Sequence, residues 1–220
     1  MTNLLFDPLK VERKITDEII VAFSGGKESI VTLDMCCRHF DRVSAFFLYI
    51  APNLSFQEKQ LEWYEKKYNL NIMRLPHPMV SEFFRYGTYR NMNPDVPIIG
   101  INDVYSYVRW LTGMHWISAG ERIDDSIVRR AMIKHSGTVD AQRGRFYPVA
   151  NWSKKDIFAY IKHHNLRIGK DSQVLGFSYR GLEGNQLHAL KVHFPQDYEK
   201  IKKLYPLCEA GVKRYEQYGK

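Results

Sequence analysis

The segment Ser24-Gly25-Gly26-Lys27-Glu28-Ser29 has residue types and spacing that suit the binding of an anion. An apolar run at 18–23 precedes it and a helix-like pattern follows. Small residues between a buried strand and a helix N-terminus bring backbone N–H groups to one point, where the helix dipole adds positive charge. The glycines let phosphate oxygens approach, while serine hydroxyls and a lysine add donors and charge. The alternative interpretation is an ordinary strand-to-helix turn with a serine cap.

A second polar segment begins at Gly120, directly after a run at 115–119 that is typical of a buried strand. Arg122 and Arg129 follow, and a guanidinium can donate two parallel hydrogen bonds to phosphate or sulfate oxygens. Asp125 stands four residues before Arg129, so the competing interpretation is an ion pair at the start of a helix.

Together with a third segment, these strings resemble the motifs of the PP-loop superfamily of ATP pyrophosphatases and phosphoadenylyl-sulfate (PAPS) reductases. Residues 24–29 resemble S-G-G-x-D-S, with Glu28 in place of the aspartate. Residues 120–129 resemble G-x-R-x-x-[DE]-S-x-x-R, and residues 148–161 resemble P-[ILV]-x-x-W-[ST]-x-x-D-[IV]-x-x-[YF]-I. The resemblance covers about residues 18–165 and, within the superfamily, is nearest to small PAPS-reductase-like proteins of the kind that phages and mobile elements encode.

This resemblance implies a set of site residues. Lys27 and Arg122 are the expected catalytic residues, because they carry charge toward the phosphates. The segment after the second predicted strand resembles a family region that helps to hold the nucleotide, which adds Asn53 and, with less weight, Pro52 and Glu58. The expected nucleotide-binding residues are Ser24, Gly25, Gly26, Lys27, Glu28, Ser29, Asn53, Gly120, Arg122, Asp125 and Arg129.

The implied ligand is ATP or PAPS with Mg²⁺. An intact first motif resembles members that cleave ATP between the α and β phosphates, so we expect adenylylation of an acceptor, in sulfur or nitrogen transfer or in nucleic-acid modification. One alternative is a sulfonucleotide reductase that uses Cys208, although the family's Glu-Cys-Gly-Leu-His tail is replaced by Cys208-Glu209-Ala210-Gly211. Another is a non-catalytic nucleotide-binding subunit.

Cysteines and histidines do not have the spacing of a metal site. Three cysteines are fewer than the four thiolates of an iron–sulfur cluster, so we expect no such cluster. His188 and His193 are five residues apart, which does not fit a helical zinc pair, and we expect no zinc. Phe83, Phe84 and the tyrosines of 76–110 suit base stacking, but packing is the first interpretation.

Strand-like and helix-like patterns alternate along the chain. Strands are expected at 18–24, 43–50, 71–75, 115–119 and 146–148, and helices at 28–40, 56–68, 103–112, 124–135 and 153–164, with Ser153 as a cap. Residues 76–102 read mostly as loop. This alternation predicts an α/β fold with a doubly wound, mostly parallel five-stranded sheet, helices on both faces and a helical C-terminal extension. Ligands of such folds bind at the carboxyl ends of the strands.

The length, charge and composition of the chain indicate its domain organisation and its partners. We expect a nucleotide-binding domain at 1–187 and, at 188–220, a helical extension of it in which Pro195 and Pro206 each begin a helix. The formal charge of +8, from 32 basic and 24 acidic residues, suits polyanionic partners. We expect an adenine nucleotide as partner, with a nucleic acid or an acceptor protein as further candidates. No run suits a membrane helix or a signal peptide, so the expected location is the cytoplasm, and homo-oligomer formation stays open.

Overall fold

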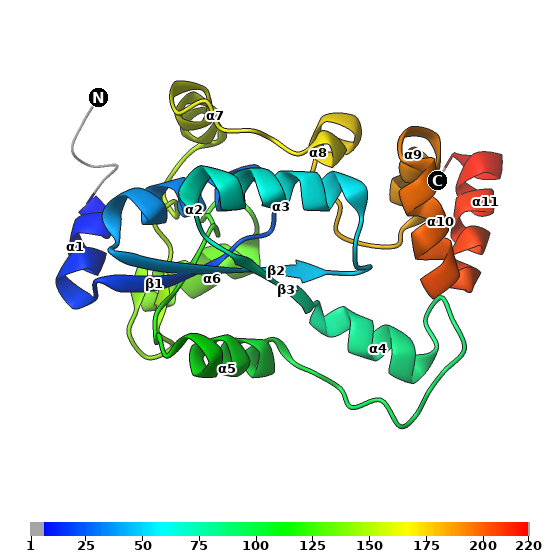
Figure 1. Cartoon of the computed structure of the whole chain (residues 1–220), viewed down its shortest axis with the longest axis horizontal. Helices are drawn as coiled ribbons and strands as arrows, with labels where there is room; N and C mark the ends of the chain where they lie inside the picture. The colour runs from blue at the N-terminus through cyan, green and yellow to red at the C-terminus, as the bar shows by residue number, and fades with distance from the viewer. Residues whose placement is uncertain (1–6, 220) are drawn as a thin grey trace. The chain divides into compact units, whose positions relative to one another are not determined.

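The centre of the structure, a computed structural model that describes residues 7–219, is a six-stranded sheet of order β3-β2-β1-β4-β6-β5 (Figure 1). The strands are β1 (Glu18–Ala22), β2 (Arg42–Tyr49), β3 (Ile72–Pro76), β4 (Ile117–Ala119), β5 (Val139–Asp140) and β6 (Arg145–Phe146). β1 pairs in parallel with β2 and β4, β4 pairs in parallel with β6, and β5 runs antiparallel to β6. The predicted α/β fold with a mostly parallel sheet is confirmed. β5 was not predicted, because a strand of two residues is too short to show an alternation of apolar and polar residues.

Helices connect these strands and form the tail of the chain. They are α1 (Asp7–Ile15), α2 (Lys27–His39), α3 (Ser55–Tyr68), α4 (Pro78–Tyr86), α5 (Ile101–Thr112), α6 (Ile127–Ser136), α7 (Lys154–His163), α8 (Lys170–Leu175), α9 (Gly184–His193), α10 (Pro195–Leu204), the 3-10 turn η2 (Pro206–Cys208) and α11 (Glu209–Tyr218). Within residues 7–219, no helix has the length and apolar character that crossing a membrane requires.

The chain forms two compact units. The first comprises residues up to Phe47, Trp63–Met73 and Tyr105–Ile168, and the second comprises Leu48–Glu62, Arg74–Val104 and the residues from Gly169 onward. The predicted boundary between 187 and 188 stays a prediction.

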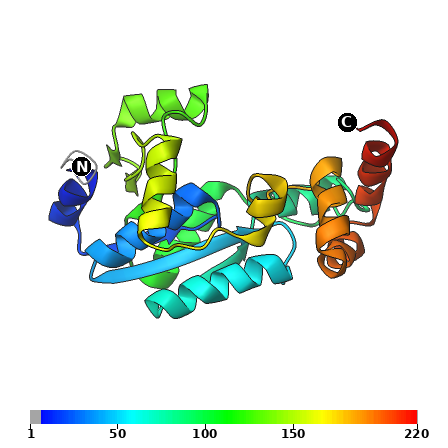
Figure 2. The ribbon, with the colours of Figure 1, turned by 90° about the horizontal axis from the view of Figure 1, so that it is seen from above.

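The first unit holds the strand ends that carry the sequence motifs. Ala22 of β1 lies beside Ala119 of β4, so the segments that follow the two strands leave the sheet at the same level. α2 and α7 pack together on one side of the strands, and α5 covers the other side (Figure 1). α6 lies farthest toward the rear of that view, as Figure 2 shows from above.

The second unit has its own apolar core. Ile50 and Leu54 contribute to it from the segment after β2, and Phe83 contributes from α4. The tail helices supply Leu187, Tyr198, Tyr205 and Val212, among others. Pro195 begins α10 and Pro206 begins η2, as predicted.

Residues 76–102 lie mostly outside helices and strands, as predicted, but the short helix α4 forms within them. The His77 side chain accepts a hydrogen bond from the Met79 N–H, Pro78 occupies the first turn, and Gly87 ends the helix in the left-handed conformation. Proline and glycine, which looked like loop residues, therefore mark the two ends of a short helix. Phe83 packs edge-on against Tyr89 and Tyr205, in agreement with the packing interpretation.

Candidate functional site

The segment between β1 and α2 is a tight loop whose serines hold its shape. Ser24 donates to the Ser29 hydroxyl from its backbone N–H and from its own hydroxyl, both at 3.1 Å. The Ser29 hydroxyl donates in turn to the Gly26 carbonyl at 2.9 Å, and Gly25 has a φ of 74°. Gly26 is the N-cap of α2, and no side chain caps this helix end. The first N–H groups of α2 therefore have no side-chain acceptor, which is the arrangement that suits an anion.

Gly120 lets the end of β4 approach the first turn of α2. A Cβ atom at this position would lie 2.8 Å from the Glu28 carbonyl carbon and 2.9 Å from the Ser29 nitrogen. These are backbone atoms, so no side-chain rotation could relieve the clash. The residue at this position must therefore be glycine for the two segments to lie this close.

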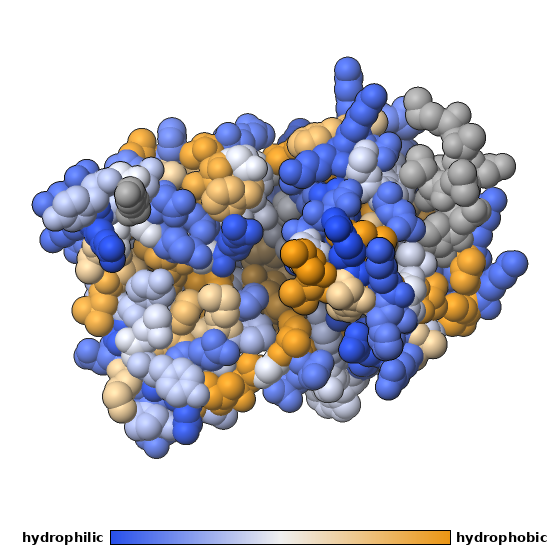
Figure 3. Space-filling view, turned by 180° about the vertical axis from the view of Figure 1, so that it is seen from behind, coloured by the Kyte–Doolittle hydropathy of each residue, from blue (hydrophilic) through white to orange (hydrophobic). Residues whose placement is uncertain are grey.

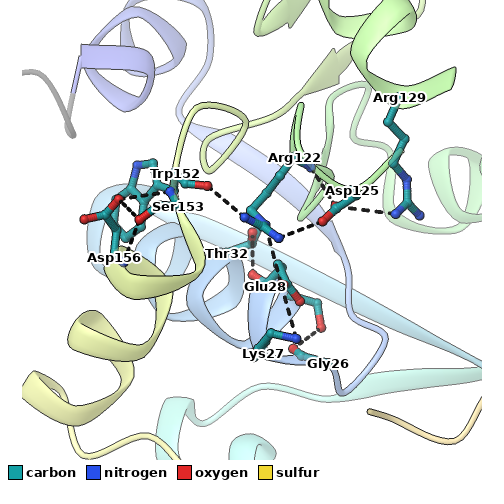
Figure 4. Close-up of polar contacts among 11 residues, drawn as sticks. Gly26, Lys27, Glu28, Thr32, Arg122, Asp125, Arg129, Trp152, Ser153 and Asp156 are labelled. Carbon is teal, nitrogen blue, oxygen red and sulfur yellow. Dashed lines mark hydrogen bonds and ion pairs between the residues drawn. The ribbon is translucent and has the colours of Figure 1, made fainter. Parts of the chain in front are cut away.

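The Arg122 guanidinium joins three segments of the first unit (Figure 4). It donates to Asp125 Oδ1 at 2.8 Å and to the Trp152 carbonyl at 3.0 Å, and its Nε lies 3.5 Å from Glu28 Oε1. The side chain is 2% exposed. A buried guanidinium with these partners fixes the segment 120–125 against the start of α2 and the residues before α7.

Two other charged side chains near this point remain partly open to solvent. Lys27 Nζ lies 3.5 Å from Glu28 Oε1, and the Lys27 side chain is 27% exposed. Arg129 lies 3.4 Å from Asp125 Oδ2 and is 49% exposed. The helix-start ion pair considered as an alternative for Arg129 is therefore present, although half of the side chain stays accessible.

The N-terminal ends of α2, α6 and α7 converge around Arg122. Asp125 lies directly before the Ser126 N-cap of α6, whose hydroxyl accepts the Arg129 N–H at 3.1 Å. Trp152 lies directly before the Ser153 N-cap of α7, where Ser153 and Asp156 form the predicted cap as a full capping box. The partial positive charges of three helix N-termini thus lie around one group of side chains.

The structure brings most of the predicted site residues together in the first unit. Ser24 to Ser29 and Gly120, Arg122, Asp125 and Arg129 lie in this unit. Asn53 belongs to the second unit, where it has a φ of 58° and its carbonyl accepts a hydrogen bond from Lys200 Nζ at 2.6 Å. The role of Asn53 in nucleotide binding stays a prediction.

Sequence reasoning missed a second buried arginine next to the Gly120 segment. Arg145 lies 3.3 Å from Glu121 Oε1, and its guanidinium stands 4.6 Å from the centre of the Tyr105 ring and 5.4 Å from that of Tyr147. Glu121 directly precedes Arg122, and it pairs with Arg145 on β6. The available signal was a charged residue, Arg145, directly before the aromatic residues Phe146 and Tyr147 of the predicted strand.

The Cys208 thiol has the properties of a buried core group. It is 0% exposed in the core of the second unit, and burial, with help from Glu209, raises its pKa to about 11. A thiol with such a pKa is almost wholly protonated near neutral pH, whereas nucleophilic attack requires the thiolate.

One protein-family model matches the part of the chain that contains this site. Residues 18–170 match the model described as "Phosphoadenosine phosphosulfate reductase domain". The chain belongs to this PAPS reductase domain family. The match covers β1, the loop after it, the Gly120 segment and α7. The resemblance to members from phages and mobile elements stays a prediction.

Curated relatives in this family include two named reductases. The chain is 28% identical over 159 residues to a phosphoadenosine 5'-phosphosulfate reductase of Gloeobacter violaceus, covering 68% of this chain and 64% of the relative. It is 25% identical over 158 residues to an adenosine 5'-phosphosulfate reductase of Allochromatium vinosum, with 68% and 61% covered. An uncharacterized protein of Methanocaldococcus jannaschii is 27% identical over 209 residues, with 85% and 41% covered. The chain therefore spans less than two thirds of the length of each of these relatives.

Solved structures with a similar arrangement include two further enzymes. An NH₃-dependent NAD synthetase from Campylobacter jejuni, in complex with the nitrate ion, has 15% identity and a TM-score of 0.49, with 98% of this chain and 93% of that chain covered. The U34-tRNA thiolase NcsA from Methanococcus maripaludis has 13% identity and a TM-score of 0.48, with 92% and 78% covered.

The exclusion of an iron–sulfur cluster is corrected by this comparison. NcsA is described with its [4Fe-4S] cluster, and the expectation of no cluster is therefore withdrawn. Among the residues that the structure describes, no group of three or more His, Cys, Asp and Glu side chains is placed to hold a metal ion. That finding concerns the described side chains alone and does not restore the exclusion.

Proposed function

We propose that this chain is an adenine-nucleotide-binding enzyme that cleaves ATP between the α and β phosphates and transfers AMP to an acceptor. The observation that carries the proposal is the uncapped N-terminus of α2, which follows a glycine loop and lies against the Gly120 segment. Backbone N–H groups at such an end bind phosphate oxygens well. Lys27 begins this helix and adds a partly exposed positive charge.

In this reaction an acceptor oxygen attacks the α-phosphorus, and the bond from the α-phosphorus to the oxygen that bridges to the β-phosphate breaks. Pyrophosphate leaves with the bond electrons, and the acceptor proton passes to solvent. The loop N–H groups and Lys27 stabilise the charge that accumulates on the departing phosphates. Arg122 acts as a positioning residue in this proposal, because Asp125, Glu28 and the Trp152 carbonyl already surround its guanidinium. Arg129 is the arginine that has exposed surface to offer a ligand.

The family match favours a second candidate function, which is the reduction of a sulfonucleotide. That reaction would need a thiolate to attack the sulfate sulfur, and Cys208 is the candidate that the sequence offers. Its burial and its raised pKa weigh against this role. A non-catalytic nucleotide-binding subunit is the third candidate, and the cytoplasm stays the predicted location.

The test is product analysis with ATP and with PAPS, in separate reactions that contain divalent cations and candidate acceptors. We expect AMP and pyrophosphate from ATP, loss of both in Lys27→Ala protein, and unchanged rates in Cys208→Ser protein. Sulfite from PAPS that depends on thioredoxin and disappears in Cys208→Ser protein would establish the reductase instead. Binding of ATP without any turnover across the acceptor set would favour the non-catalytic subunit.

A further inference from the structure

The segment 126–168 of the first unit presents a one-sided distribution of charge. It contains nine lysines and arginines and only two aspartates. Its exposed basic residues are Arg129, Arg130, Lys134, Arg143, Lys154, Lys155, Lys162 and Arg167. Neither aspartate is an exposed residue. Asp140 is buried and pairs with Arg143, and the Asp156 carboxylate accepts hydrogen bonds in the capping box of α7. Asp125 and Asp124, which directly precede the segment, lie 3.4 Å from Arg129 and 3.9 Å from Arg130, while the other exposed basic residues of the segment face no exposed acidic side chain of its own.

α6 carries part of this charge and packs little against its own unit. Only Ile133 of its residues is buried, while Ile127 and Val128 are 83% and 78% exposed. These aliphatic residues stand directly before Arg129 and Arg130 in the chain, so apolar and basic side chains share one exposed helix. Figure 3 shows the face that includes α6, where hydrophobic and hydrophilic side chains lie side by side.

α7 repeats this combination with an aromatic residue. Phe158 is 49% exposed, and helical spacing places it between Lys154 and Lys155 on one side and Lys162 on the other. An exposed aromatic ring flanked by lysines is the combination with which proteins stack a nucleic-acid base and bind the adjacent phosphates. Because α6 and α7 both begin beside Arg122, a ligand of these helices would lie next to the candidate nucleotide site.

We propose that α6 and α7 bind the backbone of a single-stranded or unpaired segment of nucleic acid, and that this nucleic acid is the acceptor. The second half of this inference rests on the proposed function, because it names the substrate class of the same site. The absence of exposed acids in 126–168 favours a polyanion over a protein surface of mixed charge, and Phe158, Ile127 and Val128 favour accessible bases over a closed duplex.

The experiment is fluorescence anisotropy of a labelled 20-nucleotide single-stranded RNA with the full chain, over a range of salt concentrations and without nucleotide. The test variant is Lys134→Gln/Lys155→Gln/Lys162→Gln. The matched control is Lys14→Gln/Lys203→Gln/Lys213→Gln, which removes the same charge from exposed positions elsewhere in the chain. We expect the test variant to bind about tenfold more weakly than wild type, and its slope of log K against log salt to be smaller by about 2. The control should change affinity less than about twofold.

Equal weakening in the two triple variants, or no binding by wild type at low salt, would overturn the proposal. Phe158→Ala should weaken RNA binding about fivefold or more, and an unlabelled duplex of the same length should compete poorly. Equal competition by the duplex, with no effect of Phe158→Ala, would overturn the single-strand preference. Thermal unfolding checks that each variant is folded. If the triple variant unfolds at a lower temperature than wild type, the single variants Lys155→Gln and Lys162→Gln are measured in its place. RNA binding that persists while ATP is neither bound nor cleaved would contradict the proposed function and leave this surface standing.

Discussion

At the scale of single residues, the site depends on a contact that only glycine permits. The backbone at Gly120 approaches the first turn of α2 so closely that a methyl group would overlap the Glu28 carbonyl carbon and the Ser29 nitrogen. That turn supplies the N–H groups to which we assign phosphate binding. A change at Gly120 therefore acts on the nucleotide site through the position of α2.

We expect Gly120→Ala to lower the affinity for a non-hydrolysable ATP analogue about tenfold or more and to destabilise the fold by about 1–3 kcal/mol. Titration calorimetry and thermal unfolding measure the two effects. Gly100→Ala is the matched control, because its Cβ would meet only Asp103 Oδ2, at an ordinary contact distance of 3.4 Å. Wild-type affinity in the Gly120→Ala protein would contradict the role given to this contact.

At the scale of elements, the Asp34 carboxylate ties α2 to two other helices. It accepts hydrogen bonds from Arg38 Nε at 2.7 Å, from the Tyr160 hydroxyl at 2.7 Å and from the Tyr68 hydroxyl. Tyr68 ends α3 and Tyr160 lies on α7. Burial alone would raise the pKa of Asp34, but these hydrogen bonds outweigh it and lower the pKa. The ionised carboxylate is therefore the form that holds these helices together.

We expect Asp34→Asn to lower the free energy of unfolding by about 2–4 kcal/mol at pH 7, because the amide leaves donors of the three partners poorly matched. Because the pKa of Asp34 is lower in the folded state than in the unfolded state, its ionisation stabilises the fold at any pH above the unfolded-state pKa. This stabilisation is lost as the pH falls through the folded-state pKa. The difference between wild type and variant in urea unfolding should therefore shrink below about pH 4. A difference that stays constant from pH 7 to pH 3 would refute this account.

Glu12 on α1 creates the opposite dependence on pH. Its side chain is 0% exposed, neither carboxylate oxygen has a hydrogen-bond partner among the described residues, and burial raises its pKa to about 9. At pH values between the pKa of Glu12 in the unfolded chain and about 9, Glu12 is protonated in the folded state and ionised in the unfolded state. Stability from this group is therefore complete at low pH and is lost as the pH rises.

We expect the free energy of unfolding of the wild type to fall with pH, relative to Glu12→Gln protein, by about 1.4 kcal/mol per unit between about pH 6 and pH 8.5. The glutamine keeps the shape of the side chain and cannot ionise. Urea unfolding of both proteins at several pH values in this interval measures the slope. Parallel pH profiles would mean that Glu12 does not carry a raised pKa.

At the scale of the whole molecule, the sequence was informative where long periodic patterns or chemically constrained loops occur. α2, α3 and α7 were predicted to within about two residues at each end, because buried helices repeat their apolar residues regularly and Ser153 marks a cap. β5 has two residues, gives almost no periodic signal and was missed, whereas β6 overlaps the strand predicted at 146–148. α1 was missed, and its buried Glu12 gave no apolar signal. α4 was missed because its capping residues looked like a loop.

Part of the candidate site could also be predicted from the sequence, and part could not. Sequence order placed Gly120 and Arg122 beside the loop at 24–29, because parallel strand ends meet at one edge of a sheet. It gave no indication that Arg122 would be buried among Asp125, Glu28 and a carbonyl, since those partners come from three segments. Tertiary contacts of this kind decide which charged side chains keep exposed surface, and single-sequence patterns do not contain them.

The central claim is that the loop at 24–29 binds the phosphates of an adenine nucleotide, and calorimetry with ATP and with adenosine tests it without knowledge of the acceptor. We predict that wild-type protein binds ATP at least about tenfold more tightly than adenosine, and that Lys27→Ala loses most of this advantage while its affinity for adenosine stays the same. Equal affinities for ATP and adenosine in wild type, or an unchanged ATP affinity in Lys27→Ala, would contradict the account.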